Sequence, residues 1–194
     1  MQFTTFATLF TAAAVLGAPT EPTKSMSIAA LGETVFDQGD GFYLASYNDA
    51  GALKVNFTPM AELDTTTPPA EHLTTRSTHL LSKRETVCSG RTSVNLGNLD
   101  AANVQLAKNA AAQVTYNGGA WGWVHNGGET SYFCNYATNY LTYQLIIDMH
   151  TVVSGRCGQN GYGYDRRRGG GGANDLSVGR TFRGDHFCDD STHG

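Results

Sequence analysis

The sequence has no apolar run of the roughly 20 residues that a membrane-spanning helix needs. It also carries little charge, because Asp, Glu, Lys and Arg make up 15% of its 194 residues and the formal net charge is -4. We therefore expect neither a membrane span nor a highly charged disordered chain. The protein is also not basic enough for tight or specific nucleic-acid binding.

Proline and cysteine are scarce, and they divide the chain. The five prolines all lie before residue 70, whereas the four cysteines and both tryptophans lie after residue 85. This uneven distribution predicts two parts of different character.

The first part begins with a pattern typical of a secretory signal peptide. An apolar stretch at 3–16 is too short for a stop-transfer helix, and the small residue Gly17 follows it. We predict a signal peptide at 1–17 and a secreted, extracellular protein. The alternative is a buried N-terminal helix, but no polar face interrupts the stretch.

A Thr-, Pro- and Ser-rich stretch at 62–82 predicts a linker, because it has too little apolar surface to order itself. The dibasic pair Lys83-Arg84 follows it directly. In a secreted protein this position indicates a kexin-type processing site, although a dibasic pair can also be ordinary solvated surface. We expect a pro-segment at 18–84 and a mature domain at 85–194.

Within the pro-segment, residues 41–57 alternate apolar and polar on both sides of a turn at 48–51, which predicts a β-hairpin. Asn56 begins an Asn-Phe-Thr acceptor sequence for glycosylation. A two-stranded hairpin is marginal alone, so the pro-segment needs the mature domain to pair with. Its role could be chaperoning, inhibition or only delivery.

Four cysteines in a secreted domain predict two disulfides. Metal binding is the rival interpretation, but the sequence has no C-x-x-C pair, and we predict no metal or other cofactor. Cys134 and Cys188 both lie close to predicted strands, which favours a bridge between them and leaves Cys88 for Cys157. Three connectivities remain possible.

The mature domain alternates strands and helices. An amphipathic pattern with Asn98 as N-cap predicts a helix over 98–113, and a second helix follows over 141–155, with Gly155 as C-cap. Asn126-Gly127 predicts a tight hairpin turn. With strands at 86–94, 161–165 and 176–182, the order is β-α-β-β-α-β-β. This predicts an α+β fold, a two-layer sandwich of an antiparallel sheet with two helices on one face.

Three short motifs carry a resemblance. These are the aromatic-Cys-Asn-Tyr run at 132–136, Arg-Cys-Gly at 156–158 and the Phe-Cys ending at 187–188. They resemble small secreted cysteine-containing proteins of filamentous fungi, some of which share the α/β sandwich fold of the killer toxins of smut fungi. The resemblance implies a non-enzymatic virulence effector or toxin-like protein that binds a host or competitor protein, its own pro-segment or a second effector. Members often carry an additional cysteine pair, which this chain lacks.

The alternative function is a small secreted ribonuclease of the guanyl type. Such enzymes need a carboxylate or His base, a His acid and an Arg over the phosphate. The residue types are present in Glu129, His125, His186 and Arg183. However, His125 and Glu129 flank the Asn-Gly turn, where solvated polar residues are expected anyway. A Ser-His-Asp hydrolase is a weaker alternative, because the sequence has no G-x-S-x-G motif. We predict no catalytic residues.

Two further features allow more than one interpretation. Arg166, Arg167 and Arg168 precede four glycines and predict a flexible loop, with a second processing site or an anion-binding site as alternatives. Trp121 and Trp123 point to the same side of one strand. We expect them in the core under the helices; on an open sheet face they would be an interface anchor.

Overall fold

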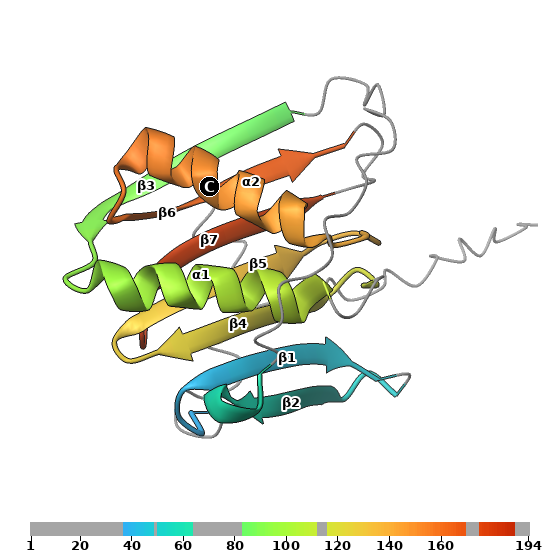
Figure 1. Cartoon of the computed structure of the whole chain (residues 1–194). Coiled ribbons are helices and arrows are strands. Elements are labelled where there is room, and N and C mark those ends of the chain that lie inside the picture. The colour runs from blue at the N-terminus through green and yellow to red at the C-terminus, as the bar shows by residue number, and fades with distance from the viewer. Residues whose placement is uncertain (1–36, 49, 64–82, 112–115, 170–174, 189–194) are drawn as a thin grey trace, which may run out of the picture.

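The computed structural model describes residues 37–48, 50–63, 83–111, 116–169 and 175–188 (Figure 1). The predicted signal peptide and residues 64–82 of the predicted linker lie outside these ranges. In the part of the chain that is described, no helix is long and apolar enough to cross a membrane.

The centre of the fold is a seven-stranded sheet in which all neighbouring strands are antiparallel. Its spatial order is β2-β1-β4-β5-β7-β6-β3. The strands are β1 (Gly41–Tyr47), β2 (Leu53–Pro59), β3 (Lys83–Thr92), β4 (Ala120–Asn126), β5 (Glu129–Asn135), β6 (Gly161–Arg168) and β7 (Leu176–Phe182). The helices α1 (Leu96–Ala111) and α2 (Tyr143–Cys157) lie across one face of this sheet (Figure 1). The antiparallel sheet and the two helices agree with the sequence prediction.

Both helices begin at side-chain caps. The Asn98 N–H donates to Asn95 Oδ1 at 3.1 Å at the start of α1, so Asn95 caps this helix in place of the expected Asn98. At the start of α2 the Leu145 N–H donates to Thr142 Oγ1 at 3.1 Å. The helix continues past Gly155 and ends before Gly158, whose φ of 92° requires glycine.

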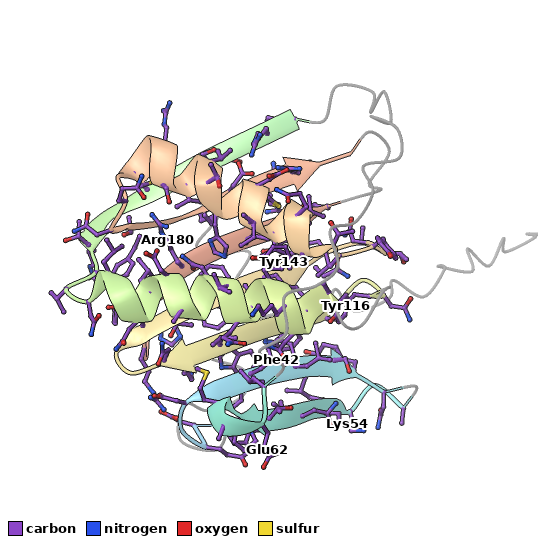
Figure 2. The ribbon with its side chains drawn as sticks, in the orientation of Figure 1. Phe42, Lys54, Glu62, Tyr116, Tyr143 and Arg180 are labelled. Carbon is purple, nitrogen blue, oxygen red and sulfur yellow. A yellow bond between two sulfur atoms is a disulfide. The ribbon has the colours of Figure 1, made fainter. Side chains whose placement is uncertain are left out.

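The apolar core lies between the helices and the sheet. The helices contribute Leu106, Ile146 and Met149, and all three side chains are 0% exposed. Val124, Phe133 and Val178 face them from three neighbouring strands. Full burial of such a side chain stabilises the fold by roughly 1.5–3 kcal/mol. Strand β1 joins the same core, and Phe42 lies on the side of β1 toward α1 (Figure 2).

The hairpin predicted within residues 41–57 is present as β1 and β2, joined by a turn in which the Ala52 N–H donates to Asn48 Oδ1. It forms one sheet with the predicted mature domain, because β1 pairs with β4 from Gly41 opposite His125 to Ala45 opposite Trp121. The sheet therefore has two strands more than the five expected for residues 85–194. The short 3-10 helix Met60–Glu62 follows β2.

Two disulfides connect residues that lie far apart in the sequence. One joins Cys134 in β5 to Cys188 beyond β7, and the other joins Cys88 in β3 to Cys157 at the end of α2. These are the two pairs that the sequence argument favoured. No cysteine is left over. Both bridges lie within residues 85–194, so neither ties the β1–β2 hairpin to the rest of the chain.

Candidate functional site

An aromatic cluster fills the sheet face opposite the helices. Its central members are Tyr43, Trp121, Trp123, Tyr132 and Phe187, and none of them exposes more than 4% of its surface. The two tryptophans are buried, as expected, but the expected position under the helices is wrong. Alternation along β4 sends Val124 toward the helices and both tryptophans to the other face.

The hairpin supplies the layer that covers Trp123. The Tyr43 ring lies parallel to the Trp123 ring, with centroids 4.9 Å apart and an interplanar angle of 2°. Phe57 of β2 packs against the outer side of this pair, 4.6 Å from Tyr43. Tyr132 lies on the neighbouring strand β5, and the Phe187 ring stacks on it with ring centroids 4.4 Å apart. Stacked aromatic pairs of this kind add about 0.5–1.5 kcal/mol beyond the burial of their area.

An ionic contact lies at the start of the hairpin, beside the turn between β4 and β5. Arg183 donates from Nε to Asp37 Oδ2 at 2.9 Å and from Nη2 to the second oxygen of the same carboxylate. Its Nη1 donates to Asp40 Oδ1 at 2.8 Å. The Gly127 N–H donates to the other oxygen of Asp40 at 3.0 Å. We call these four residues the Asp–Arg clamp.

The clamp changes the titration of its members. The hydrogen bond and positive charge of Arg183 lower the pKa of Asp37, and the two carboxylates raise the pKa of Arg183. Beside the clamp, His125 contacts the edge of Tyr43 and bonds Thr130 Oγ1 through Nδ1 at 2.8 Å. Burial, and then the charge of Arg183, lower the pKa of His125 to about 4. His125 is therefore neutral near pH 7.

The residues of the ribonuclease alternative are not brought together. His125 lies opposite Thr130, whereas Glu129 points to the other side of β5 and accepts hydrogen bonds from Ser93 and Tyr162, both at 2.7 Å. His186 is exposed. Arg183 is occupied by the clamp. The expectation that His125 and Glu129 are solvated turn residues is wrong, because they are 8% and 2% exposed.

The dibasic pair Lys83-Arg84, which follows the predicted linker directly in sequence, opens strand β3 and is part of the sheet. Arg84 donates from Nε and Nη2 to the carboxylate of Asp165 on β6, at 2.9 and 2.8 Å. Asp165 is fully buried and also accepts from Thr86 Oγ1 at 3.0 Å. A charge-assisted pair on a buried acid holds the end of this edge strand in the sheet.

The three arginines at 166–168 are also part of a strand and not of a loop. They pair with carboxylates: Arg166 with Asp175 at 2.8 Å, Arg167 with Asp165 at 3.6 Å and Arg168 with Glu85 at 3.7 Å. Arg166 also lies over the Tyr136 ring. Pairing with β3 extends β6 to residue 168, and the acids compensate the basic charge. Of the glycines that follow, 170–172 lie outside the described residues.

A buried polar group under the helices was missed by the sequence analysis. Arg180 is 1% exposed and donates to Gly161 O, Ser154 Oγ and Gly158 O, each at 2.8 Å. His150 of α2 bonds Ser131 Oγ at 3.0 Å, and burial lowers its pKa to about 3. Arg180 lies two residues after Val178, so strand alternation places both side chains on the face of β7 toward the helices. This alternation was the only feature of the sequence that could have predicted the burial of Arg180.

Neither a metal-binding cluster among the described residues nor a similar protein identifies a functional site. The described residues contain no group of three or more His, Cys, Asp or Glu side chains that could hold a metal ion. Asn56, the predicted glycosylation acceptor, is exposed on β2. Comparison with models of protein families, with curated proteins and with solved structures found no match. The candidate site is therefore defined by geometry alone, as the β4 edge, the aromatic cluster and the clamp.

Proposed function

We propose that the chain is the pro-form of a secreted effector or toxin-like protein of a filamentous fungus. In this proposal, kexin-type cleavage after Arg84 separates residues 18–84 from a mature domain at 85–194. The mature domain is then a two-layer sandwich of the killer-toxin-like type, with the order β-α-β-β-α-β-β. It acts by binding a protein of a host or of a competitor.

The observation that carries this proposal is the position of the β1–β2 hairpin. The hairpin precedes the dibasic pair, yet it adds two strands to the sheet edge at β4 and covers Trp123 with Tyr43. The main chain is its only covalent connection to residues 85–194, because both disulfides lie within that range. A single cut can therefore separate a covering segment from a disulfide-stapled domain and expose an aromatic surface, which suits recognition of another protein.

The test follows the chain through secretion. In a kexin-competent cell, intact-mass analysis of the culture filtrate is expected to show a product that begins at Glu85, and an Arg84→Gln variant is expected to keep residues 18–84. The two proteins are then applied to host tissue and to competing fungal cultures, and cell death and growth are measured. Only the cleaved protein is expected to act. A native product that retains residues 18–84 would contradict the processing.

The same preparations separate binding from catalysis. RNA turnover by the cleaved protein that is lost on His125→Ala or Glu129→Ala would establish the ribonuclease alternative in place of this proposal. Absence of turnover together with a biological effect supports action through surface recognition.

A further inference from the structure

The clamp satisfies groups of the mature domain with two side chains of the pro-segment. Asp37 and Asp40 come from the segment before the dibasic pair, whereas Arg183 and Gly127 come after it. When the hairpin leaves, the Arg183 guanidinium loses both of its carboxylate partners and the Gly127 N–H loses its acceptor. Both groups lie at one corner of the sheet. Such a corner prefers a carboxylate or another anion.

Tyr43 connects this corner to the aromatic cluster. Its hydroxyl donates to Gly39 O at 2.7 Å and accepts from the Gln38 N–H at 2.9 Å, so it fixes the short loop that carries both aspartates. The same ring stacks on Trp123 and is 0% exposed. The acids and the aromatic ring therefore engage the domain as one unit.

The strand edge beneath the hairpin also loses its hydrogen-bond partner when the hairpin leaves. The outer edge of β4 pairs with β1 over five residues, from Gly41 to Ala45, and these backbone groups need a partner whenever β1 is absent. A ligand that only neutralised Arg183 would leave this strand edge unpaired.

We propose that the edge of β4, Trp123 and Arg183 form a peptide-binding site that the pro-segment masks by occupying it. The ligand that replaces the hairpin is an extended segment of a partner protein, which adds a strand antiparallel to β4 and carries carboxylates ahead of an aromatic residue, as Asp37, Asp40 and Tyr43 do. This inference rests on the proposed release of the pro-segment, and it names the chemistry of the partner.

The strand edge favours a peptide over a nucleic acid. Addition of a strand satisfies the backbone donors and acceptors of β4, which phosphates and bases do not. A single arginine also neutralises few phosphates.

The experiment uses the full chain with a recognition sequence for a site-specific protease inserted between residues 64 and 82. The cut is then independent of kexin, so failure of natural processing and failure of this inference give different results. The probe is a fluorescent peptide of residues 37–63, offered to the uncut and to the cut protein. Exchange with the bound hairpin is followed by fluorescence anisotropy.

Binding is expected only after the cut. A probe with Asp37→Asn and Asp40→Asn is expected to bind at least about tenfold more weakly, and Tyr43→Ala in the probe is expected to weaken binding similarly. The matched control probe carries Glu62→Gln, because Glu62 is exposed and lies outside the clamp. In the protein, Arg183→Gln is expected to reproduce the loss, whereas Arg156→Gln on the exposed surface of α2 is not.

A peptide array then tests the partner chemistry. Cut protein is expected to retain peptides with two acids three residues apart and an aromatic residue three positions further on, and to lose them when the acids become amides. Equal binding of acid and amide probes would overturn the inference. Displacement of the probe by millimolar phosphate or by an RNA oligonucleotide, with no peptide retained, would also overturn it and would favour a phosphate ligand.

Discussion

Arg180 fixes the C-terminal end of α2 to the sheet. Its guanidinium donates to two backbone carbonyls and to Ser154, and the carbonyl end of a helix carries partial negative charge. Burial lowers the pKa of Arg180, but the side chain stays charged because an arginine pKa lies far above neutrality. A buried cation is tolerated here because all three of these contacts are acceptors.

We expect Arg180→Met to lower the free energy of unfolding by about 2–4 kcal/mol, since it leaves the carbonyls of Gly158 and Gly161 without these donors. Urea denaturation followed by circular dichroism measures the change. Arg156→Gln on the exposed surface of the same helix is the control, with an expected change within about 0.5 kcal/mol. If the two variants were equally stable, the hydrogen bonds of Arg180 would not contribute to the stability of the fold.

Two buried histidines predict a loss of stability in mild acid. Burial lowers the pKa of His150 to about 3 and that of His125 to about 4, whereas both have a pKa near 6.5 when unfolded. Between pH 6.5 and about 4 the unfolded chain therefore binds more protons, and the free energy of unfolding falls as the pH drops. At pH 5 we expect a loss of roughly 1–2 kcal/mol for each histidine relative to pH 7.

Urea denaturation at pH 7 and pH 5 checks this expectation. His150→Gln can keep a hydrogen bond to Ser131 and removes the titration, so its stability is expected to change less between the two pH values. If the variant and the parent protein lost the same stability on acidification, His150 would not be a source of the pH dependence.

At the level of elements, the end of β3 controls access to the dibasic pair. A protease must take Arg84 into its own specificity pocket, and in the folded chain that side chain is bound to the buried Asp165. Cleavage after Arg84 therefore requires the first residues of β3 to separate from β6.

We expect Asp165→Asn to accelerate cleavage of the folded full chain after Arg84 severalfold, because the neutral amide releases Arg84. The measurement is the rate of appearance of the Glu85 product with a purified kexin-type protease. Urea denaturation run in parallel separates local fraying from global unfolding, and Asp148→Asn on α2 serves as the control. An unchanged rate in a stably folded Asp165→Asn protein would mean that the ion pair does not limit cleavage.

The elements that the sequence predicted are those with strong local signals. Asn126-Gly127 defines one hairpin, the spacing of Leu99, Ala102 and Leu106 defines α1, and the cysteine positions favoured the observed pairs. The arginines at 166–168 were assigned to a loop because charge and glycine suggest solvent, yet their carboxylate partners Glu85 and Asp175 become neighbours only in the folded sheet. The clamp was missed for the same reason, since its acids and its arginine lie more than 140 residues apart in sequence.

At the level of the whole molecule, the two disulfides differ in their surroundings. Cys134 and Cys188 are 0% exposed, whereas Cys88 is exposed and Cys157 is only partly buried. The bridges close stretches of 54 and 69 residues, for which the chain-entropy model gives about 4 kcal/mol each.

We expect Cys88–Cys157 to be reduced at lower reductant concentration than Cys134–Cys188, because a thiolate can reach its sulfur atoms without unfolding of the domain. Stepwise reduction followed by alkylation and peptide mass analysis gives the order. Alkylation of Cys134 and Cys188 before the other pair would contradict it.

The strand order also determines when the molecule can fold during synthesis. Strand β7 is the last of the described strands along the chain but lies inside the sheet, between β5 and β6. Until residues 176–182 have left the ribosome, the nascent chain can form only two separate sheet fragments, β2-β1-β4-β5 and β6-β3. Such non-local pairing gives a high contact order and slow folding. The sheet can therefore close only after residue 182 has emerged, and each emerging chain exposes unpaired strand edges until then.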